Sequence, residues 1–377
     1  MGRRITANSA MYARLTSGGL QDIADKLDAG VRLDPDDGLR LFECPDLLAV
    51  GWLANREREK RYGNQTFFNH NIRLEATNVC VASCLFCSFA RLRPGDKDSY
   101  TMSLEQAWDK LRERSDQSLT EVHVVNGLHP DLPWDYYREL LRGFKRIKPE
   151  IHLKCFTAIE IAFFSELYGK TDEQILRELM DVGLDSLPGG GAEVFADRVR
   201  RKICHDKADA DRYLSIHRLA HRLGIPSNVT MLYGHIETNE ERIDHMVRTR
   251  SLQDETGGFQ AFIPLAFHPE NNQMRKLPPP TAADTLRVHS VARLMLDNVP
   301  HVKAFWIATG IDVAQTSLWF GVDDLDGTVQ EERIYHMAGA STPESMTPAE
   351  ISNLIRIAGR EPIERDTFYN VVAKAVE

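Results

Sequence analysis

One stretch decides the fold of this chain: Ile72-Arg73-Leu74-Glu75-Ala76-Thr77-Asn78-Val79-Cys80-Val81-Ala82-Ser83-Cys84-Leu85-Phe86-Cys87. Its first part, 72–76, is a short apolar run typical of a buried strand. The loop after it holds three cysteines spaced C-x3-C-x2-C, with an aromatic residue directly before the last. Three thiolates can bind three irons of a [4Fe–4S] cluster, which normally takes four cysteines. The loop therefore predicts a cluster with one iron open to a ligand that is not protein.

Structural zinc is the main alternative for these cysteines. A structural zinc site takes four ligands, usually supplied as paired C-x2-C units, and the chain has no second pair. His70 or His123 could complete a site, but neither has the spacing of a ligand. The pattern favours the open cluster. A non-catalytic iron–sulfur or zinc-binding protein stays the alternative from another functional class.

Outward from this stretch, short apolar runs alternate with amphipathic helices. The predicted strands are 72–76, 121–125, 151–157, 184–187, 227–232, 259–264, 302–307 and 317–321. Strands that alternate with helices form a mostly parallel sheet, and eight such units match the size of a (β/α)8 barrel. A doubly wound open sheet is the alternative, but the glycine-rich first turn typical of that fold is absent. The predicted fold class is therefore α/β, a TIM-type (β/α)8 barrel whose first βα loop carries the cysteines.

The chain divides into three predicted segments. Residues 1–66 are polar with spaced leucines and predict an N-terminal helical extension, in which Asp34-Pro35 marks a turn or a helix start. Residues 67–328 hold the barrel. Residues 329–377 predict a C-terminal helical segment packed on the barrel.

Several helices carry recognisable start signals. Thr171 and Thr347 each stand three residues before Gln or Glu, the spacing of a capping box. Asn239 is the expected cap of the helix that follows the fifth strand, and Pro278-Pro279-Pro280-Thr281 opens another.

Composition excludes several classes of function. The 377 residues carry a formal net charge of −9 and no long Lys/Arg block, which argues against nucleic acid as the main partner. No apolar run approaches the roughly 20 residues that span a bilayer, and the N-terminus lacks the apolar segment of a secretory signal. We therefore expect no membrane span.

The remaining cysteines give no second motif. Cys44, Cys155 and Cys204 are scattered, and six cysteines with three bunched in one loop do not form a disulfide framework. We expect these three to be small buried hydrophobic residues and the compartment to be a reducing cytoplasm.

The cysteine loop, placed after the first strand of a barrel, resembles the signature of the radical SAM superfamily. The resemblance implies that Cys80, Cys84 and Cys87 hold a [4Fe–4S] cluster. It also implies that the amino and carboxylate groups of S-adenosylmethionine (SAM) bind the fourth iron. Reductive cleavage of SAM then gives methionine and a 5′-deoxyadenosyl radical.

The same resemblance implies further SAM contacts. Asn126-Gly127 stands where the superfamily often has a Gly-Gly-Glu turn that meets the SAM amino group. Gly234 and Glu237 match the adenine-facing G-x-x-E segment. Glu160, at the end of the third strand, could bind ribose or the methionine ammonium group, or could equally be an acid favoured by the helix dipole. Gly189-Gly190-Gly191 would allow a ligand to approach the backbone, and is also an ordinary flexible turn.

Polar residues beyond the later strands are candidates for binding an acidic substrate. His129, His268 and Arg275 are the candidate ligands of substrate carboxylates, since Arg binds a carboxylate with two hydrogen bonds. A solvated loop is the alternative for the segment that holds His268 and Arg275. The acidic run 323–328 could bind a metal ion, but a turn that hydrogen-bonds substrate hydroxyls is the favoured interpretation.

Within the superfamily, segments 78–87, 127–130, 232–237, 266–272 and 323–328 resemble the aminofutalosine synthase family of menaquinone biosynthesis. The resemblance implies that the radical adds to the enol ether of 3-[(1-carboxyvinyl)oxy]benzoate. Rearrangement and decarboxylation then give 6-amino-6-deoxyfutalosine. Cyclic dehypoxanthinyl futalosine synthase and the F0-synthase-like enzymes are the alternatives. A reductase with flavodoxin or ferredoxin is the implied electron donor.

Overall fold

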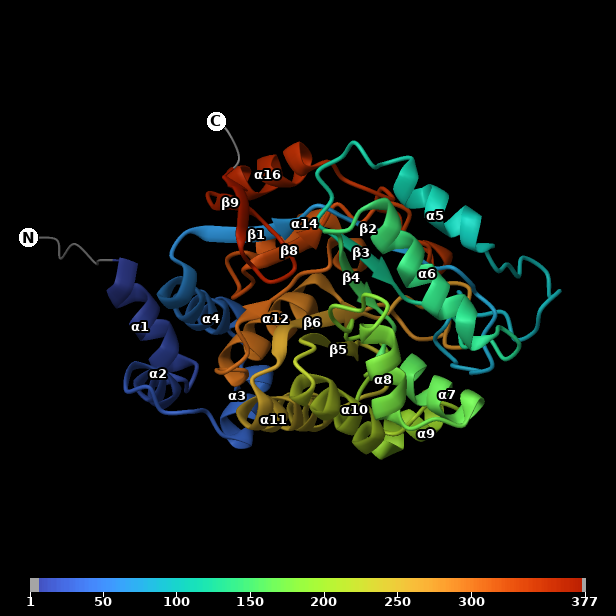
Figure 1. The fold of residues 1–377 in the computed structure, drawn as a ribbon. Coiled ribbons are helices and arrows are strands. Elements are labelled where there is room, and N and C mark those ends of the chain that lie inside the picture. The colour runs from blue at the N-terminus through green and yellow to red at the C-terminus, as the bar shows by residue number, and fades with distance from the viewer. Residues whose placement is uncertain (1–6, 375–377) are drawn as a thin grey trace, which may run out of the picture.

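The computed structural model describes residues 7–374 (Figure 1). Ten strands are present in this range: β1 Gln65–Asn69, β2 Asn71–Leu74, β3 Glu121–Val124, β4 His152–Cys155, β5 Ser227–Tyr233, β6 Phe259–Ala266, β7 His301–Val302, β8 Asp324–Gly327, β9 Glu361–Arg365 and β10 Val371–Lys374. Most of them are short and buried, and they lie at the centre of the molecule with helices around them.

Sixteen helices occur in the same range: α1 Ala7–Ser17, α2 Gln21–Asp28, α3 Pro35–Glu43, α4 Leu47–Tyr62, α5 Leu104–Arg112, α6 Trp134–Ile147, α7 Ala158–Tyr168, α8 Asp172–Met180, α9 Asp197–Ile203, α10 Ala210–Arg222, α11 Asn239–Thr256, α12 Ala282–Met295, α13 Trp306–Thr309, α14 Ile311–Ser317, α15 Ile334–Met337 and α16 Pro348–Ile357. Over residues 7–374, none of them has the length and apolar character needed to cross a bilayer.

Eight strand positions close into a parallel ring. β2, β3 and β4 form one parallel sheet, and β5, β6 and β7 form another. The two-residue segment 186–187 joins them through bridges to Lys154 and Ser227. On the other side, Lys303 bridges to Asp324 of β8, and β8 pairs with β1, which leads directly into β2. The structure therefore confirms the (β/α)8 barrel, with β1 and β2 sharing one strand position.

The N-terminal extension packs against the outside of the barrel (Figure 1). The Asp34 side chain accepts a hydrogen bond from the Asp37 amide, and Pro35 occupies the first turn of α3, so this position is a helix start. In α4, a Cβ on Gly51 would lie 2.3 Å from the Phe320 ring. This helix is therefore held against the segment that precedes β8. The expected boundaries after residues 66 and 328 remain a prediction.

Most predicted helix starts are confirmed. Thr171 and Thr347 each form the full capping box, and Thr281 caps α12. The prediction for Asn239 is wrong, because Thr238 is the cap of α11 and forms a box with Glu241. By residue type asparagine is the better cap, but Glu241, three residues after Thr238, completes a capping box with the threonine.

The last two predicted barrel strands differ from the observed ones. β7 covers only His301–Val302, and the chain then turns into α13. The predicted strand 317–321 is the end of α14 and the turn after it, in which Leu318 is fully buried. The eighth strand is β8, Asp324–Gly327, inside the run that was expected to be an acidic turn. Apolar pattern alone misplaced this strand, because its buried aspartates are paired with cations from distant parts of the chain.

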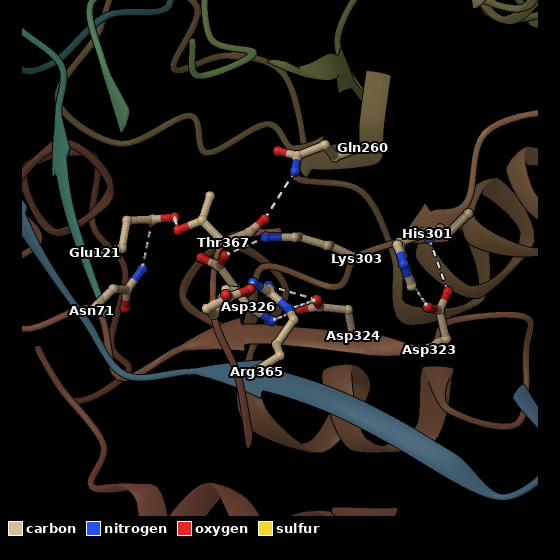
Figure 2. Close-up of polar contacts among 12 residues, drawn as sticks. Asn71, Glu121, Gln260, His301, Lys303, Asp323, Asp324, Asp326, Arg365 and Thr367 are labelled. Atoms are coloured by element: carbon tan, nitrogen blue, oxygen red, sulfur yellow. Dashed lines mark hydrogen bonds and ion pairs between the residues drawn. The ribbon is translucent and has the colours of Figure 1, made fainter. Parts of the chain in front are cut away.

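The C-terminal segment contains the expected helix α16 and also two strands that were not predicted. β9 pairs in parallel with β1, and β10 folds back antiparallel on β9. The turn between them reaches the barrel interior (Figure 2): Thr367 donates to Glu121 of β3, and Gln260 of β6 donates to the Thr367 carbonyl. This turn contributes polar side chains to the inside of the barrel.

Candidate active site

A cavity of about 240 Å³ opens at the carboxyl ends of the barrel strands. Its lining comes from β2, β3, β5 and β6, from the loops after β2, β3 and β4, from the glycine-rich turn, and from α15. Active sites of (β/α)8 barrels form at this end, because the βα loops meet there. The cavity is therefore the candidate active site.

All three cysteines of the opening motif line this cavity. Backbone hydrogen bonds fix their loop: the Cys80 amide donates to the Arg91 carbonyl, and the Leu85 amide donates to the Ile203 carbonyl. The Cys87 sulfur accepts a hydrogen bond from the Ala90 amide at 3.4 Å. Cys80, Cys84 and Cys87 thus face one space from a loop that is anchored on two sides.

The chemistry of these thiols fits a cluster. Burial raises the pKa of Cys84 to about 12 and also raises the pKa of Cys87. Both groups are therefore protonated thiols unless a metal replaces the proton. Across residues 7–374, no group of His, Cys, Asp and Glu converges on a point that one metal ion would occupy. Three cysteines in one cavity match in number the protein ligands of a [4Fe–4S] cluster that keeps one iron open.

Asn126 and Gly127 support the cysteine loop directly. The Asn126 side chain accepts from the Ala76 amide at 2.7 Å, and the Gly127 amide donates to the Thr77 carbonyl at 2.9 Å. A Cβ on Gly127 would lie 2.3 Å from the Val79 carbonyl oxygen. Both residues also line the cavity. The close backbone approach that this glycine permits is therefore to the chain just before Cys80.

Glu160 lies in the cavity wall and also caps a helix. Its carboxylate accepts from the amide and hydroxyl of Thr157, closing the capping box of α7, and from the Asn126 amide at 3.0 Å. Burial raises its pKa to about 7, and the hydrogen bonds from Thr157 and Asn126 oppose that rise. The structure confirms the helix-terminus interpretation, and binding of ribose or the methionine ammonium group by Glu160 remains a prediction.

Comparison with known proteins identifies the family. Residues 74–249 match the radical SAM superfamily, and residues 256–376 match the CofH/MqnC C-terminal region. The aminodeoxyfutalosine synthase of Thermus thermophilus is 48% identical over 93% of this chain and 95% of its own length. The chain belongs to the radical SAM superfamily.

Two further relatives and one solved structure are also similar to this chain. The aminodeoxyfutalosine synthase of Streptomyces coelicolor is 44% identical over 95% of both chains, and the cyclic dehypoxanthine futalosine synthase of the same organism is 36% identical over 93% of this chain and 88% of its own. The crystal structure of methylornithine synthase superposes with a TM-score of 0.72, at 17% identity over 90% of this chain and 96% of that one. The superposition on methylornithine synthase shows that the two proteins share a fold.

Two other predicted SAM ligands lie outside the radical SAM cavity lining. The Glu237 carboxylate accepts from the amides of Gly234 and His235 and pairs with Arg242 at 2.8 Å. Its side chain is fully buried, and these contacts hold the turn between β5 and α11. Gly234 and Glu237 therefore shape a loop of the barrel.

The three candidate carboxylate ligands also lie outside this lining. His129 accepts from the Asp131 amide through Nδ1, and His268 Nε2 contacts the Ala308 carbonyl at 2.8 Å beside a second cavity. Arg275 is exposed. The structure does not bring these residues together.

The acidic run 323–328 is part of the barrel interior and forms no metal site among the described residues. Arg293 and His301 contact Asp323, while Arg365 donates to Asp324 at 2.8 Å (Figure 2). Asp326 accepts hydrogen bonds from Lys303 and Arg73. The expected turn is therefore wrong, because Asp324 and Asp326 lie in β8 and pair with cations.

Sequence reasoning missed four charged residues of the cavity, Arg73, Glu193, Lys207 and Glu332, and weighed His123 only as a zinc ligand. Lys207 pairs with Glu193 at 2.7 Å and lies over the Phe86 ring, next to the cysteine loop. The strand pattern indicates the position of Arg73. It alternates with the apolar residues Ile72 and Leu74, so its side chain faces the barrel interior. The predicted glycine turn does line the cavity, and a Cβ on Gly189 would lie 2.7 Å from the Val229 Cα.

Proposed function

We propose that the protein is an aminodeoxyfutalosine synthase, joining the adenosyl part of SAM to 3-[(1-carboxyvinyl)oxy]benzoate. One observation carries the proposal: a chain 48% identical to an enzyme of that name places its three motif cysteines in one cavity at the carboxyl ends of the barrel strands. The product would be 6-amino-6-deoxyfutalosine, formed with rearrangement and loss of one carboxylate.

Cys80, Cys84 and Cys87 would hold a [4Fe–4S] cluster with its fourth iron open to SAM. When bound, the cluster supplies one electron that cleaves SAM to methionine and a 5′-deoxyadenosyl radical, which adds to the enol ether. Asn126 and Gly127 would hold the cysteine loop in place through the contacts described above. Glu160, which lines the cavity, would accept a hydrogen bond from SAM.

The rest of the lining keeps the reacting groups apart from water. Apolar side chains of Leu128, Ile159, Ile263, Leu265 and Phe305 form much of the wall. A dry wall limits side reactions of a carbon radical. Gly234 and Glu237 would act on the adenine only by shaping the loop after β5. A role for His129, His268 or Arg275 in binding carboxylates remains a prediction.

The neighbouring pathway enzyme is the second candidate, since a cyclic dehypoxanthine futalosine synthase is 36% identical over 93% of the chain. We also propose a reductase with flavodoxin or ferredoxin as the electron donor. All six cysteines are free, which suits a reducing cytoplasm.

One anaerobic experiment tests the proposal. Reconstituted protein is incubated with dithionite, SAM and 3-[(1-carboxyvinyl)oxy]benzoate, and the products are identified by mass. We expect a covalent adenosyl adduct that has lost carbon dioxide. Free 5′-deoxyadenosine without adduct would support the neighbouring enzyme. About four irons and four sulfides per chain support the cluster, whereas one zinc would support a non-catalytic zinc protein.

A further inference from the structure

The interior of the barrel below the cavity is charged. Bulky branched apolar side chains usually fill this space in (β/α)8 barrels. Here Lys154 pairs with Glu121 at 2.7 Å, Lys303 donates to Asp326 at 3.2 Å, and Arg73 donates to the same Asp326 at 3.0 Å (Figure 2 shows Lys303 beside Asp326). Three cations thus share two carboxylates. One positive charge in this group lacks its own counter-charge.

Other carboxyl groups near Arg73 do not supply that charge. Burial, with the nearby Glu332 carboxylate, raises the pKa of Glu75 to about 8, so Glu75 is mostly protonated at neutral pH. Glu332 pairs with His336 at 3.0 Å, and this contact raises the pKa of His336 to about 9. The Glu332–His336 pair is therefore neutral as a unit.

Arg73 is the member of this group that reaches the cavity. Its side chain is 15% exposed, and its guanidinium lies over the Phe305 ring, 4.2 Å from the ring centroid. Only Nη2 contacts Asp326, and Nε is buried without a hydrogen-bond partner. A buried guanidinium nitrogen without an acceptor is costly. Arg73 therefore lacks one hydrogen-bond acceptor, at Nε.

His123 lies beside Arg73 in the neighbouring strand, because the two residues are register partners in the β2–β3 pair. Both line the cavity. Burial and the Arg73 cation lower the pKa of His123 to about 3. His123 is thus neutral at pH 7 and can donate one ring N–H to an anion that Arg73 binds.

The surroundings of Arg73 are aromatic. Phe305 and Tyr335 both line the cavity, and their rings meet edge to face with centroids 5.6 Å apart. Arg73 belongs to β2 itself, whereas the cysteines belong to the loop beyond the end of that strand. The cation and the aromatic rings therefore mark an end of the cavity distinct from the cysteine loop.

We propose that Arg73, assisted by His123, binds the ring carboxylate of an aromatic acid substrate, with the ring placed beside Phe305 and Tyr335. The proposal rests on the proposed function and adds to it the residue that selects a benzoate. The bound carboxylate would supply the missing negative charge.

Two unreactive ligands test this assignment without turnover: 3-(1-carboxyethoxy)benzoate, the saturated substrate analogue, and 2-phenoxypropanoate, which lacks only the ring carboxylate. Their dissociation constants are measured by calorimetry on the reconstituted holoenzyme. A hydrogen-bonded charge pair contributes about 1.5–3 kcal/mol, so the wild type should prefer the first ligand by roughly 10- to 150-fold. Arg73→Gln should reduce this preference to near one, and His123→Asn should reduce it severalfold.

The preference ratio separates binding from folding, because 2-phenoxypropanoate should bind Arg73→Gln as it binds the wild type. Asp326 keeps Lys303 as partner in this variant. Should Arg73→Gln fail to fold, Arg73→Lys keeps the charge but loses the planar fork, and its ratio should fall severalfold. Arg177→Gln, on the exposed face of α8, is the matched control and should keep the full ratio.

An unchanged ratio in the Arg73 variants, or a ratio lost in Arg177→Gln, would overturn the assignment. Failure of the proposed function has a different result. A wild type that prefers the benzoate through Arg73 yet forms no adenosyl adduct refutes the reaction only. If the wild type forms the adduct but the Arg73 variants keep the same preference ratio as the wild type, only the role of Arg73 is refuted.

Discussion

Arg365 of β9 donates to Asp324 of β8 at 2.8 Å, and both side chains are fully buried. The pair joins the C-terminal hairpin to the last strand of the barrel. Its removal from one side would leave a carboxylate inside the protein without a cation.

We therefore expect Arg365→Met to lower the free energy of unfolding by about 3–5 kcal/mol, the usual cost of breaking a buried ion pair. The matched control is Arg177→Met, which breaks an exposed pair with Glu173 and should change stability by less than about 1 kcal/mol. Denaturant unfolding of both variants measures the difference. Equal effects would show that the buried pair does not hold the hairpin.

The cysteines provide a second prediction. Cys84→Ala should reduce iron from about four per chain to a small fraction of that, because a cluster on two cysteines is poorly held. Cys44→Ala removes an equally buried thiol from the N-terminal extension and should keep full iron. The iron and sulfide content per chain of both variants is measured after anaerobic reconstitution. Full iron in Cys84→Ala would remove this residue from the ligand set.

Two glycines of the cavity differ in what surrounds them. A Cβ on Gly127 would press on the Val79 carbonyl at 2.3 Å, whereas a Cβ on Gly190 would meet only the Thr157 methyl at 3.2 Å. Backbone cannot yield as a methyl group can. We expect Gly127→Ala to displace the cysteine loop and lower cluster content severalfold, and Gly190→Ala to keep most of it. Optical absorption of the reconstituted variants compares them, and the reverse order would contradict the packing argument.

The Glu332–His336 contact predicts a dependence of stability on pH. The hydrogen bond to Glu332 raises the pKa of His336 from 6.5 to about 9. A group whose pKa is raised by folding stabilises fully below its unfolded pKa, and this contribution is lost as the pH rises through its folded pKa. The melting temperature should therefore fall between about pH 6.5 and pH 9. His336→Gln should flatten this fall, while exposed His205→Gln should not; equal slopes in all three proteins would contradict the linkage.

The sequence predicted those parts of the molecule whose signals are local. The spacing of Cys80, Cys84 and Cys87 after an apolar run placed them in the first βα loop of a barrel, where the structure has them. The capping boxes of Thr171 and Thr347 are equally local, since each needs only a residue three positions ahead.

The sequence could not predict features that depend on distant partners. Asp324 and Asp326 looked like a turn because charged residues seldom fill a barrel interior; their cations come from Arg365, Lys303 and Arg73, far along the chain. His268 and Arg275 are predicted substrate ligands because of their residue types and their place in a loop. Neither property shows whether a side chain reaches the cavity. Only the closed barrel shows that Arg73, within a strand, reaches the cavity.

The hairpin of β9 and β10 also determines when the protein can finish folding. Thr367 and Arg365 complete hydrogen bonds of Glu121 and Asp324 from the last part of the described chain. A ribosome delivers these residues after every strand of the barrel has been made. The barrel interior therefore stays incompletely paired until the β9–β10 hairpin has been made and has docked.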